Sequence, residues 1–183
     1  MLGVALNEQL PVKDARTGEP EAWDALFRRY QLPLYTYVFE LVRHEQTSLD
    51  IVQETFISAA RHIGSLRDDA KFGSWLFGIA HQKCLQRMRR RSFDTAPLEE
   101  AINEWVEEGE APDELLLRKE EEARFMDCLN QLAPPRRAVL LLHFLEDFSL
   151  EEIADVTETE LGTVKSRIHY AKKALRKLWE ESA

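Results

Sequence analysis

Several residue types that mark other kinds of protein are scarce in this chain of 183 residues. Its two cysteines, Cys84 and Cys128, are far apart and form no CxxC pair, which argues against a disulfide scaffold or a thiolate metal site. The five histidines show no HExxH or other ligand spacing, and neither a glycine-rich phosphate loop nor a GxSxG motif is present. We therefore expect no metal, no cofactor and no catalysis by this chain, and we expect both cysteines to be buried.

Long apolar runs are also missing. No run approaches the roughly 20 residues that a membrane span needs, and residues 1–23 lack the pattern of a signal peptide. These absences predict a cytoplasmic protein without membrane insertion. Only seven glycines and seven prolines occur, β-branched alternation is rare, and 44% of the residues are apolar. This composition favours an all-α fold with a real hydrophobic core.

Negative charge is concentrated in one segment. The chain has a net charge of −9, yet residues 94–122 alone hold twelve acidic and two basic residues. The segment also contains Pro97, Gly109 and Pro112, so we interpret it as a linker between two halves that have clear helical patterns. Either it is solvated and extended, or its apolar residues dock on a partner and its carboxylates mimic nucleic acid; those apolar residues are Leu98, Ile102, Trp105 and Val106.

The last forty residues have the pattern of a helix-turn-helix. Ser149 and Glu152 have the spacing of a capping box, which predicts the start of the first helix. Thr159 is the predicted cap of the second. Apolar residues recur at threes and fours along both helices, which predicts two amphipathic helices that pack on each other: Leu150, Ile153, Ala154, Leu161, Val164, Ile168, Ala171, Leu175 and Leu178.

The charge changes sign within this motif. Residues 146–160 hold seven acids and no base, whereas residues 161–179 hold six lysines or arginines and no acid. Phosphate groups would be attracted to the second helix, which suits a helix that reads a duplex. An ordinary amphipathic hairpin with a solvated basic face has the same periodicity. The outward residues include Thr163, Lys165, Ser166, Arg167, His169, Tyr170 and Lys173.

The first half of the chain divides into helices at recognisable points. Residues 21–42 are helical in pattern, with Pro33 expected to kink or interrupt the helix. A second helix is predicted from about Ser48, and its polar stripe carries Asp50, Gln53 and Glu54. That stripe is either a solvent face or a docking face for another pair of helices.

The helix predicted from Phe72 changes character along its length. It begins with aromatic residues, among them Phe72 and Trp75, and ends with four arginines, Arg87, Arg89, Arg90 and Arg91. Such an arrangement suits a nucleic acid whose bases are exposed and whose backbone is held by cations. Aromatic residues at helical spacing are also typical of a hydrophobic core.

Four motifs, in this order and spacing, resemble those of bacterial RNA polymerase sigma factors of the extracytoplasmic-function (ECF) group. They are GEPEAWDALFRRY, DIVQETFISAARHI, RDDAKFGSWLFGIAHQKCLQRMRRR, and a long C-terminal stretch that runs from LNQLAPPRRAV to KKALRKL. The resemblance implies two small helical domains joined by the acidic linker: sigma domain two in residues 1–93, the linker in residues 94–122, and sigma domain four in residues 123–183.

The resemblance also implies partners and residue roles. Asp50, Gln53 and Glu54 would bind core RNA polymerase. Promoter DNA would be contacted at its minus-ten element by Phe72, Trp75, Gln82, Arg87, Arg89, Arg90 and Arg91. The minus-thirty-five element would be contacted by Thr163, Lys165, Ser166, Arg167, Tyr170, Lys172, Lys173 and Arg176. An anti-sigma factor that covers the polymerase-binding faces is the expected inhibitor.

Some positions depart from the family pattern. His81 and Gln82 occupy places where the family usually has Arg and Asn, which predicts an atypical minus-ten sequence. Glu158 lies where the family usually has a glycine that allows a turn with positive φ. Because glutamate has a Cβ atom, we expect backbone strain there. Two other functions fit parts of the sequence: a helix-turn-helix regulator that does not bind core polymerase, and a helical adaptor between proteins. The first would need an α/β receiver domain upstream, and the second leaves both basic helices unused.

Overall fold

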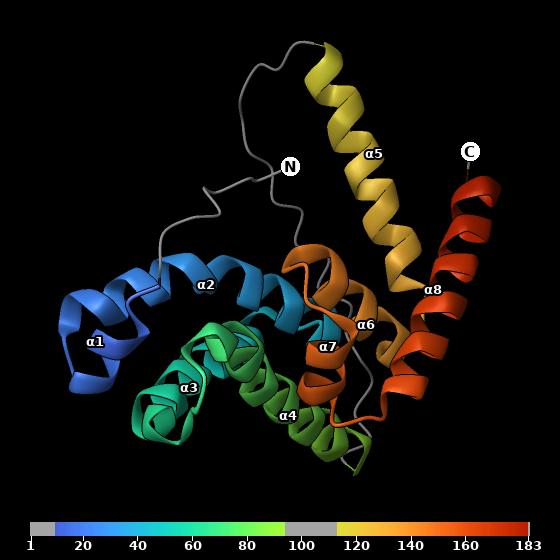
Figure 1. The fold of residues 1–183 in the computed structure, drawn as a ribbon. Coiled ribbons are helices and arrows are strands. Elements are labelled where there is room, and N and C mark those ends of the chain that lie inside the picture. Colours follow the sequence, from blue (N-terminus) through green and yellow to red (C-terminus); the bar gives the residue numbers. More distant parts are fainter. Residues whose placement is uncertain (1–9, 94–112, 183) are drawn as a thin grey trace.

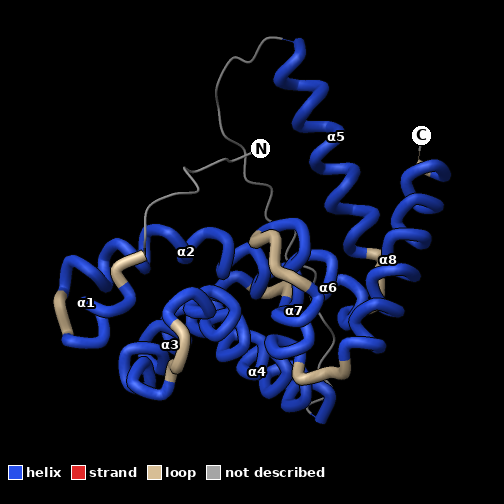
Figure 2. The backbone as a smooth tube through the Cα atoms, viewed as in Figure 1, coloured by secondary structure: helices blue, strands red, loops and turns tan. Residues whose placement is uncertain are grey.

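The computed structural model describes residues 10–93 and 113–182, and within these ranges the chain is built of helices and short loops (Figure 1, Figure 2). The described part contains no strand, which agrees with the all-α prediction. Two short 3-10 helices, η1 (Ile63–Ser65) and η2 (Asp69–Lys71), connect α3 to α4. The α-helices are α1 (Val12–Thr17), α2 (Pro20–Val42), α3 (Glu45–His62), α4 (Phe72–Phe93), α5 (Asp113–Asn130), α6 (Pro134–Leu145), α7 (Leu150–Thr157) and α8 (Leu161–Glu181).

Local sequence explains where the long N-terminal helices begin. Pro20 is the first residue of α2, where its missing N–H costs nothing and its fixed φ suits the helix. The helix continues through Pro33 to Val42. Helix α3 begins three residues before the predicted Ser48, because the ring of His44 accepts a hydrogen bond from the Thr47 amide at 3.2 Å.

The helix-turn-helix has the predicted start and the predicted positive φ at Glu158 in its turn, but the cap of its second helix differs. The Ser149 hydroxyl accepts a bond from the Glu152 amide, and the Glu152 carboxylate accepts one from the Ser149 amide, so the capping box is confirmed. Helix α7 ends at Thr157, and Glu158, its C-cap residue, has φ +48° in the left-handed region. The predicted cap of α8 is wrong: Glu160 is the N-cap residue, and no side chain caps the helix.

Helices α1 to α4, which we call domain two, enclose the first part of the core. Leu26 and Leu34 of α2 meet Ile51 of α3 and Leu76 of α4, and all four side chains are fully buried. Cys84 is buried with them, as predicted, and burial raises the pKa of its thiol to about 12. This packing determines which face of α4 remains accessible from outside domain two.

Helices α5 to α8 are called domain four. Its core includes Leu140 of α6, Ile153 of α7 and Val164 of α8. Residues 113–122, predicted as the end of the linker, form the first half of α5. The second half packs on the C-terminal turn of α8, where the Arg124 guanidinium lies 4.1 Å from the centre of the Trp179 ring. The rest of the predicted linker, residues 94–112, lies outside the described residues.

The two domains pack directly on each other, and their buried residues form one continuous core. Helix α7 lies along α4, and α6 lies against α2 (Figure 1). The rings of Phe77 and Phe148 meet edge to face, with centroids 5.4 Å apart. A Cβ atom on Gly78 would lie 3.9 Å from the Cα of Val156, an ordinary van der Waals distance, so α4 and α7 are in close contact at this point.

Candidate nucleic-acid interface

The three predicted polymerase-binding residues share one side of α3. Gln53 and Glu54 are exposed, and Asp50 is half-buried and accepts a hydrogen bond from the Gln46 side chain at 3.0 Å. Glu54 also faces α4, because Arg87 Nη2 and Lys83 Nζ lie 3.3 and 3.5 Å from its carboxylate oxygens. The polar stripe of α3 is therefore exposed to solvent along most of its length, and Glu54 at its end is tied to α4 by these ion pairs.

Two exposed apolar residues extend this stripe and were not among the predicted site residues. Leu49 is 47% exposed and Ile57 is 46% exposed, one helical turn before and after Gln53. Large apolar side chains left in water on a helix with a polar stripe are typical of a surface that binds another protein. Their four-residue spacing was visible in the sequence, but a helix core has the same spacing.

Phe72 lies in the core of domain two. Its side chain is fully buried, and its ring contacts the rings of Trp23, Tyr30 and Trp75, with centroid separations of 6.5, 5.6 and 5.9 Å. The sequence left two interpretations open for these aromatic residues, namely contact with nucleic acid and packing in the core. The structure places Phe72 in the core. Trp75 is half-buried and reaches the surface.

Trp75 and Gln82 line a groove on the open face of α4. One arm of the groove, with a volume of about 450 Å³, runs between the end of α3 and α4 past Ser58 and Lys83. The other arm, of about 460 Å³, runs between α4, the loop before it and the end of α7. An indole ring beside an amide in a groove of this size can stack on and hydrogen-bond a single base.

His81 lies beside this groove and is neutral. Its Nδ1 atom is 2.7 Å from the Tyr37 hydroxyl, and its side chain is buried. Burial lowers the pKa of His81 to about 4, and the nearby positive charge of Arg167 adds to the effect. An arginine at this place would be cationic, so His81 removes one positive charge from α4.

The arginine cluster lies at the C-terminal end of α4. Arg87 is half-buried against Glu54, whereas Arg89 and Arg90 are exposed. The side chain of Arg91 lies outside the described residues. Cations on this exposed end would meet phosphate groups of a strand that lies in the groove.

Helix α8 buries one stripe and exposes the predicted DNA-binding residues. Val164, Ile168 and Ala171 pack inward. Arg167 is half-buried on the side near His81. The Tyr170 ring lies 6.0 Å from the Arg136 guanidinium. The remaining predicted residues are exposed: Thr163, Lys165, Ser166, Tyr170, Lys172, Lys173 and Arg176.

The structure contains no competing metal site in the part of the chain that it describes, where no group of three or more acidic, histidine or cysteine residues is placed to hold an ion. Among the same residues, no helix combines the length and the apolar character that crossing a membrane requires. A helix-turn-helix beside a second domain that ends in arginines defines a two-domain, helical, DNA-binding protein.

Comparison with known families identifies the kind of DNA-binding protein. Residues 26–93 match the model of sigma-70 region 2, and residues 122–175 match that of sigma-70 region 4. The chain belongs to the ECF group of the sigma-70 family of RNA polymerase sigma factors. The recognition made from the four sequence motifs is thereby confirmed.

Three of its relatives match along nearly their whole length. The RNA polymerase sigma-H factor of Pseudomonas aeruginosa is 32% identical over 97% of this chain and 95% of its own. The ECF sigma-E factor of Salmonella typhimurium is 32% identical over 93% of each chain. The ECF sigma factor SigW of Bacillus subtilis is 27% identical over 91% of this chain and 93% of its own.

Two solved structures share the fold at 22% sequence identity. The sigma factor RpoE, solved with the anti-sigma factor NepR from Bartonella quintana, has a TM-score of 0.70, and the match covers 87% of this chain and 98% of that one. CnrH, solved with the cytosolic domain of CnrY, has a TM-score of 0.67, with 94% of this chain and 97% of that one covered.

Proposed function

We propose that the chain binds core RNA polymerase, brings it to specific promoters and helps to open the duplex, with the work divided between its two domains. The observation that carries this proposal is the family match over both domains, each of which presents an exposed basic surface. A helix-turn-helix regulator without core binding, or a protein adaptor, does not account for a sigma-70 region 2. Polymerase supplies the chemistry, so the chain itself need not be an enzyme.

The exposed stripe of α3 is the proposed polymerase contact. Asp50, Gln53 and Glu54 supply its polar groups, and Leu49 and Ile57 supply apolar area on either side of Gln53. A polar stripe flanked by exposed apolar residues can form hydrogen bonds and bury surface at the same time. The hydrogen bonds and the buried apolar surface would both favour binding to a helical surface of the large polymerase subunit.

The open face of α4 is the proposed minus-ten site. Trp75 and Gln82 would stack on and read a base that has left the duplex, and opening a duplex requires such a site for the freed base. Phe72 would act by holding Trp75 from beneath, since its own ring is buried. The strand backbone would be held by Arg87, Arg89, Arg90 and Arg91.

The exposed face of α8 is the proposed minus-thirty-five site. The first turns of a recognition helix meet base edges, and later turns meet the backbone. Base contacts are assigned to Thr163, Lys165, Ser166 and Arg167. Backbone contacts are assigned to Tyr170, Lys172, Lys173 and Arg176.

The proposed setting is the cytoplasm, where core polymerase and promoters are found. An anti-sigma factor is the proposed regulator, because RpoE, which shares this fold, was solved with one. Its binding would cover the polymerase-binding stripe of α3.

Run-off transcription with purified core polymerase tests the proposal. On a panel of promoter fragments, added protein should produce at least one defined start site. Arg167→Ala should lower promoter-specific initiation by about tenfold or more, the loss expected for one base contact, with core binding unchanged. Lys177→Ala is the matched control, because Lys177 is exposed on α8 and pairs within its own helix with Glu181.

Core binding is measured separately. Replacement of Asp50 and Gln53 by alanine should weaken the complex with core polymerase, with little change in the unfolding midpoint. If no template gains a start site, the proposed function is wrong. An equal loss of core binding in Arg167→Ala would refute the assignment of α8 to DNA.

A further inference from the structure

Helix α6 presents exposed side chains on both sides of α8, the proposed DNA-reading helix. Ala171 belongs to the buried stripe of α8, and α6 is one of the helices on which α8 packs. Neighbouring residues of a helix lie about 100° apart around its axis. Tyr170 and Lys172, the neighbours of Ala171, therefore lie on opposite flanks of α8. Each of them lies against an exposed residue of α6.

The first flank pairs Tyr170 with Arg136. Arg136 is exposed in the first turn of α6, and its guanidinium lies 6.0 Å from the centre of the Tyr170 ring. Tyr170 is itself 54% exposed. A guanidinium that lies over an aromatic ring keeps N–H donors free at its edge, so it can bind a phosphate group while the ring limits its movement.

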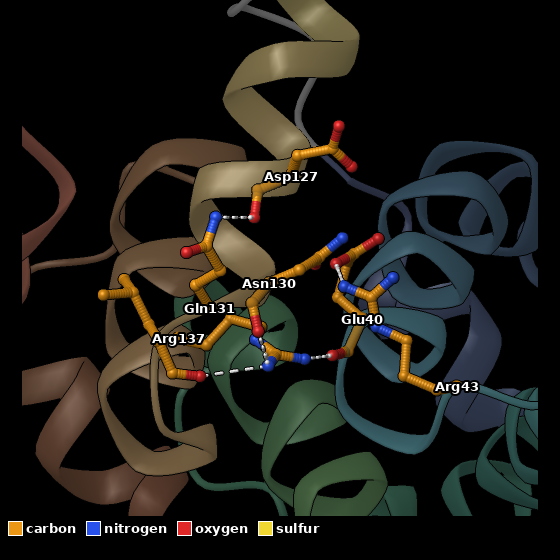
Figure 3. Close-up of polar contacts among 7 residues, drawn as sticks. Glu40, Arg43, Asp127, Asn130, Gln131 and Arg137 are labelled. Carbon is orange, nitrogen blue, oxygen red and sulfur yellow. Dashed lines mark hydrogen bonds and ion pairs between the residues drawn. The ribbon is translucent and has the colours of Figure 1, made fainter. Parts of the chain in front are cut away.

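Arg137 fixes the start of α6 and so the direction of Arg136. The Arg137 guanidinium donates to the backbone oxygens of Asn130, at 2.7 Å, and Leu132, at 3.0 Å, and also to that of Glu40 (Figure 3). Arg137 is only 7% exposed, so water does not compete for these bonds. The bonds to Asn130 and Leu132 lie within domain four. They hold the first turn of α6 with Arg136 on its outer side.

The second flank pairs Lys172 with Phe144. Lys172 Nζ lies 5.5 Å from the centre of the Phe144 ring, near the C-terminal end of α6. Phe144 is 56% exposed, although a ring of this size is usually buried. A long lysine side chain loses much rotamer freedom when it is ordered. A ring beneath the ammonium group reduces that loss at binding, because it holds the charge in place beforehand.

The two flanks of α8 match the two walls of a major groove. A helix in the groove, which is about 12 Å wide, has one phosphate backbone on each side. Each flank carries one cation, Arg136 or Lys172, and no acid in the described part of the chain forms an ion pair with either. The charge of these flanks therefore suits phosphate groups.

We infer that α6 extends the minus-thirty-five site to both walls of the groove. Arg136 binds a phosphate group of one strand, and Phe144 is a positioning residue that holds Lys172 toward the other strand. This inference rests on the proposed function of α8 and adds two residues of α6 to that site. Contacts to phosphate carry no sequence information, so these residues raise affinity for DNA without changing the sequence that is preferred.

Removal of the Arg136 charge tests the first contact. Holoenzyme is assembled from core polymerase and this protein, and anisotropy measures its binding to a fluorescein-labelled promoter duplex at a series of KCl concentrations. Arg136→Gln should weaken binding by about three- to tenfold and lower the slope of log K against log salt by about 0.9, as expected for one lost phosphate contact. A duplex with a scrambled minus-thirty-five element should lose affinity by the same factor.

Two variants serve as controls for Arg136→Gln. Lys177→Gln should change neither the affinity nor the slope, because Lys177 is exposed on α8 and pairs with Glu181 of its own helix at 3.5 Å. Arg136→Lys keeps the charge and should keep the wild-type slope. If the slope in Arg136→Gln equals that of wild type, or if only the intact minus-thirty-five element loses affinity, Arg136 does not bind phosphate. Weaker binding of Arg136→Gln to core polymerase in the absence of DNA would assign this flank to a protein partner and overturn the inference.

A double-mutant cycle tests the second contact. Phe144→Leu keeps an apolar side chain and removes the ring, so holoenzyme should bind the promoter duplex about two- to fivefold more weakly, the effect of one exposed cation–π contact. In a Lys172→Ala background, the same replacement should have little effect, because no ammonium group is left to position. An equal loss in both backgrounds would show that Phe144 does not act through Lys172.

Run-off transcription distinguishes failure of this inference from failure of the proposed function. If wild-type holoenzyme initiates at a defined site and Arg136→Gln binds DNA as wild type does, the role of α6 alone is refuted. If wild-type protein directs initiation on no template, the proposed function itself fails.

Discussion

Replacing Glu158 by glycine should stabilise the protein. Glu158 has φ +48° and ψ +45° at the end of α7, where the following amide bonds back to the Ala154 oxygen at 3.1 Å. A residue with a Cβ atom loses roughly 1–2 kcal/mol in the left-handed region. Glycine avoids this loss, but its freer unfolded chain returns about 0.5–1 kcal/mol. The expected net gain is about 0.5–1 kcal/mol of unfolding free energy, or about 2 °C in Tm for a chain of this size.

Glu158→Gln separates strain from charge. Glutamine keeps the Cβ atom and removes the negative charge, so it should leave the backbone strain in place. Urea unfolding followed by circular dichroism measures all three proteins, with the slope of the transition checked for a change in the unfolded state. If glutamine stabilises the protein as much as glycine does, repulsion among the acids of the turn is the cause and strain is not. A loss of stability in Glu158→Gly would show that no strain exists at this turn.

Two further predictions concern residues near α4 and α8. Gly73→Ala should lower the unfolding free energy by about 1–3 kcal/mol, because the new Cβ would lie 2.9 Å from the hydroxyl of the buried Tyr30. Gly162 lies in α8 with open space around it, so Gly162→Ala should instead raise the unfolding free energy by up to about 1 kcal/mol. Urea unfolding measures both variants, and a loss of stability in both would refute the steric argument. The pKa of His81 is lowered to about 4, so below pH 6.5 the unfolded state binds a proton that the folded state does not, and stability falls as the pH drops from about 6.5 to 4. Relative to His81→Gln, the wild-type protein should lose about 3 kcal/mol of unfolding free energy over this pH range. If the unfolding free energies of the two proteins change in parallel with pH, His81 is not neutral and buried.

Many features were predictable because their causes lie within a few residues of one another. The capping box at Ser149 and Glu152, the left-handed turn at Glu158 after α7 and the buried stripe of α8 all follow from patterns that span a few residues. The predicted cap at Thr159 failed because several polar residues in the turn can fill the same role, and the backbone geometry selects among them. The family motifs added the order of the two domains, which periodicity alone does not reveal.

The sequence by itself determined an all-helical chain, its main helix boundaries, the reversal of charge between α7 and α8, and its membership of the ECF sigma factors. Tertiary structure alone decided which amphipathic faces meet. It buried Phe72, left Trp75 at the surface, made His81 neutral beside Tyr37, and placed Asp155 within 4.0 Å of Lys71. The reason is physical: an apolar stripe encodes that it must be buried, but the surface that buries it lies far along the chain. Arg29 and Glu146, separated by 117 positions, are paired only because α6 lies against α2.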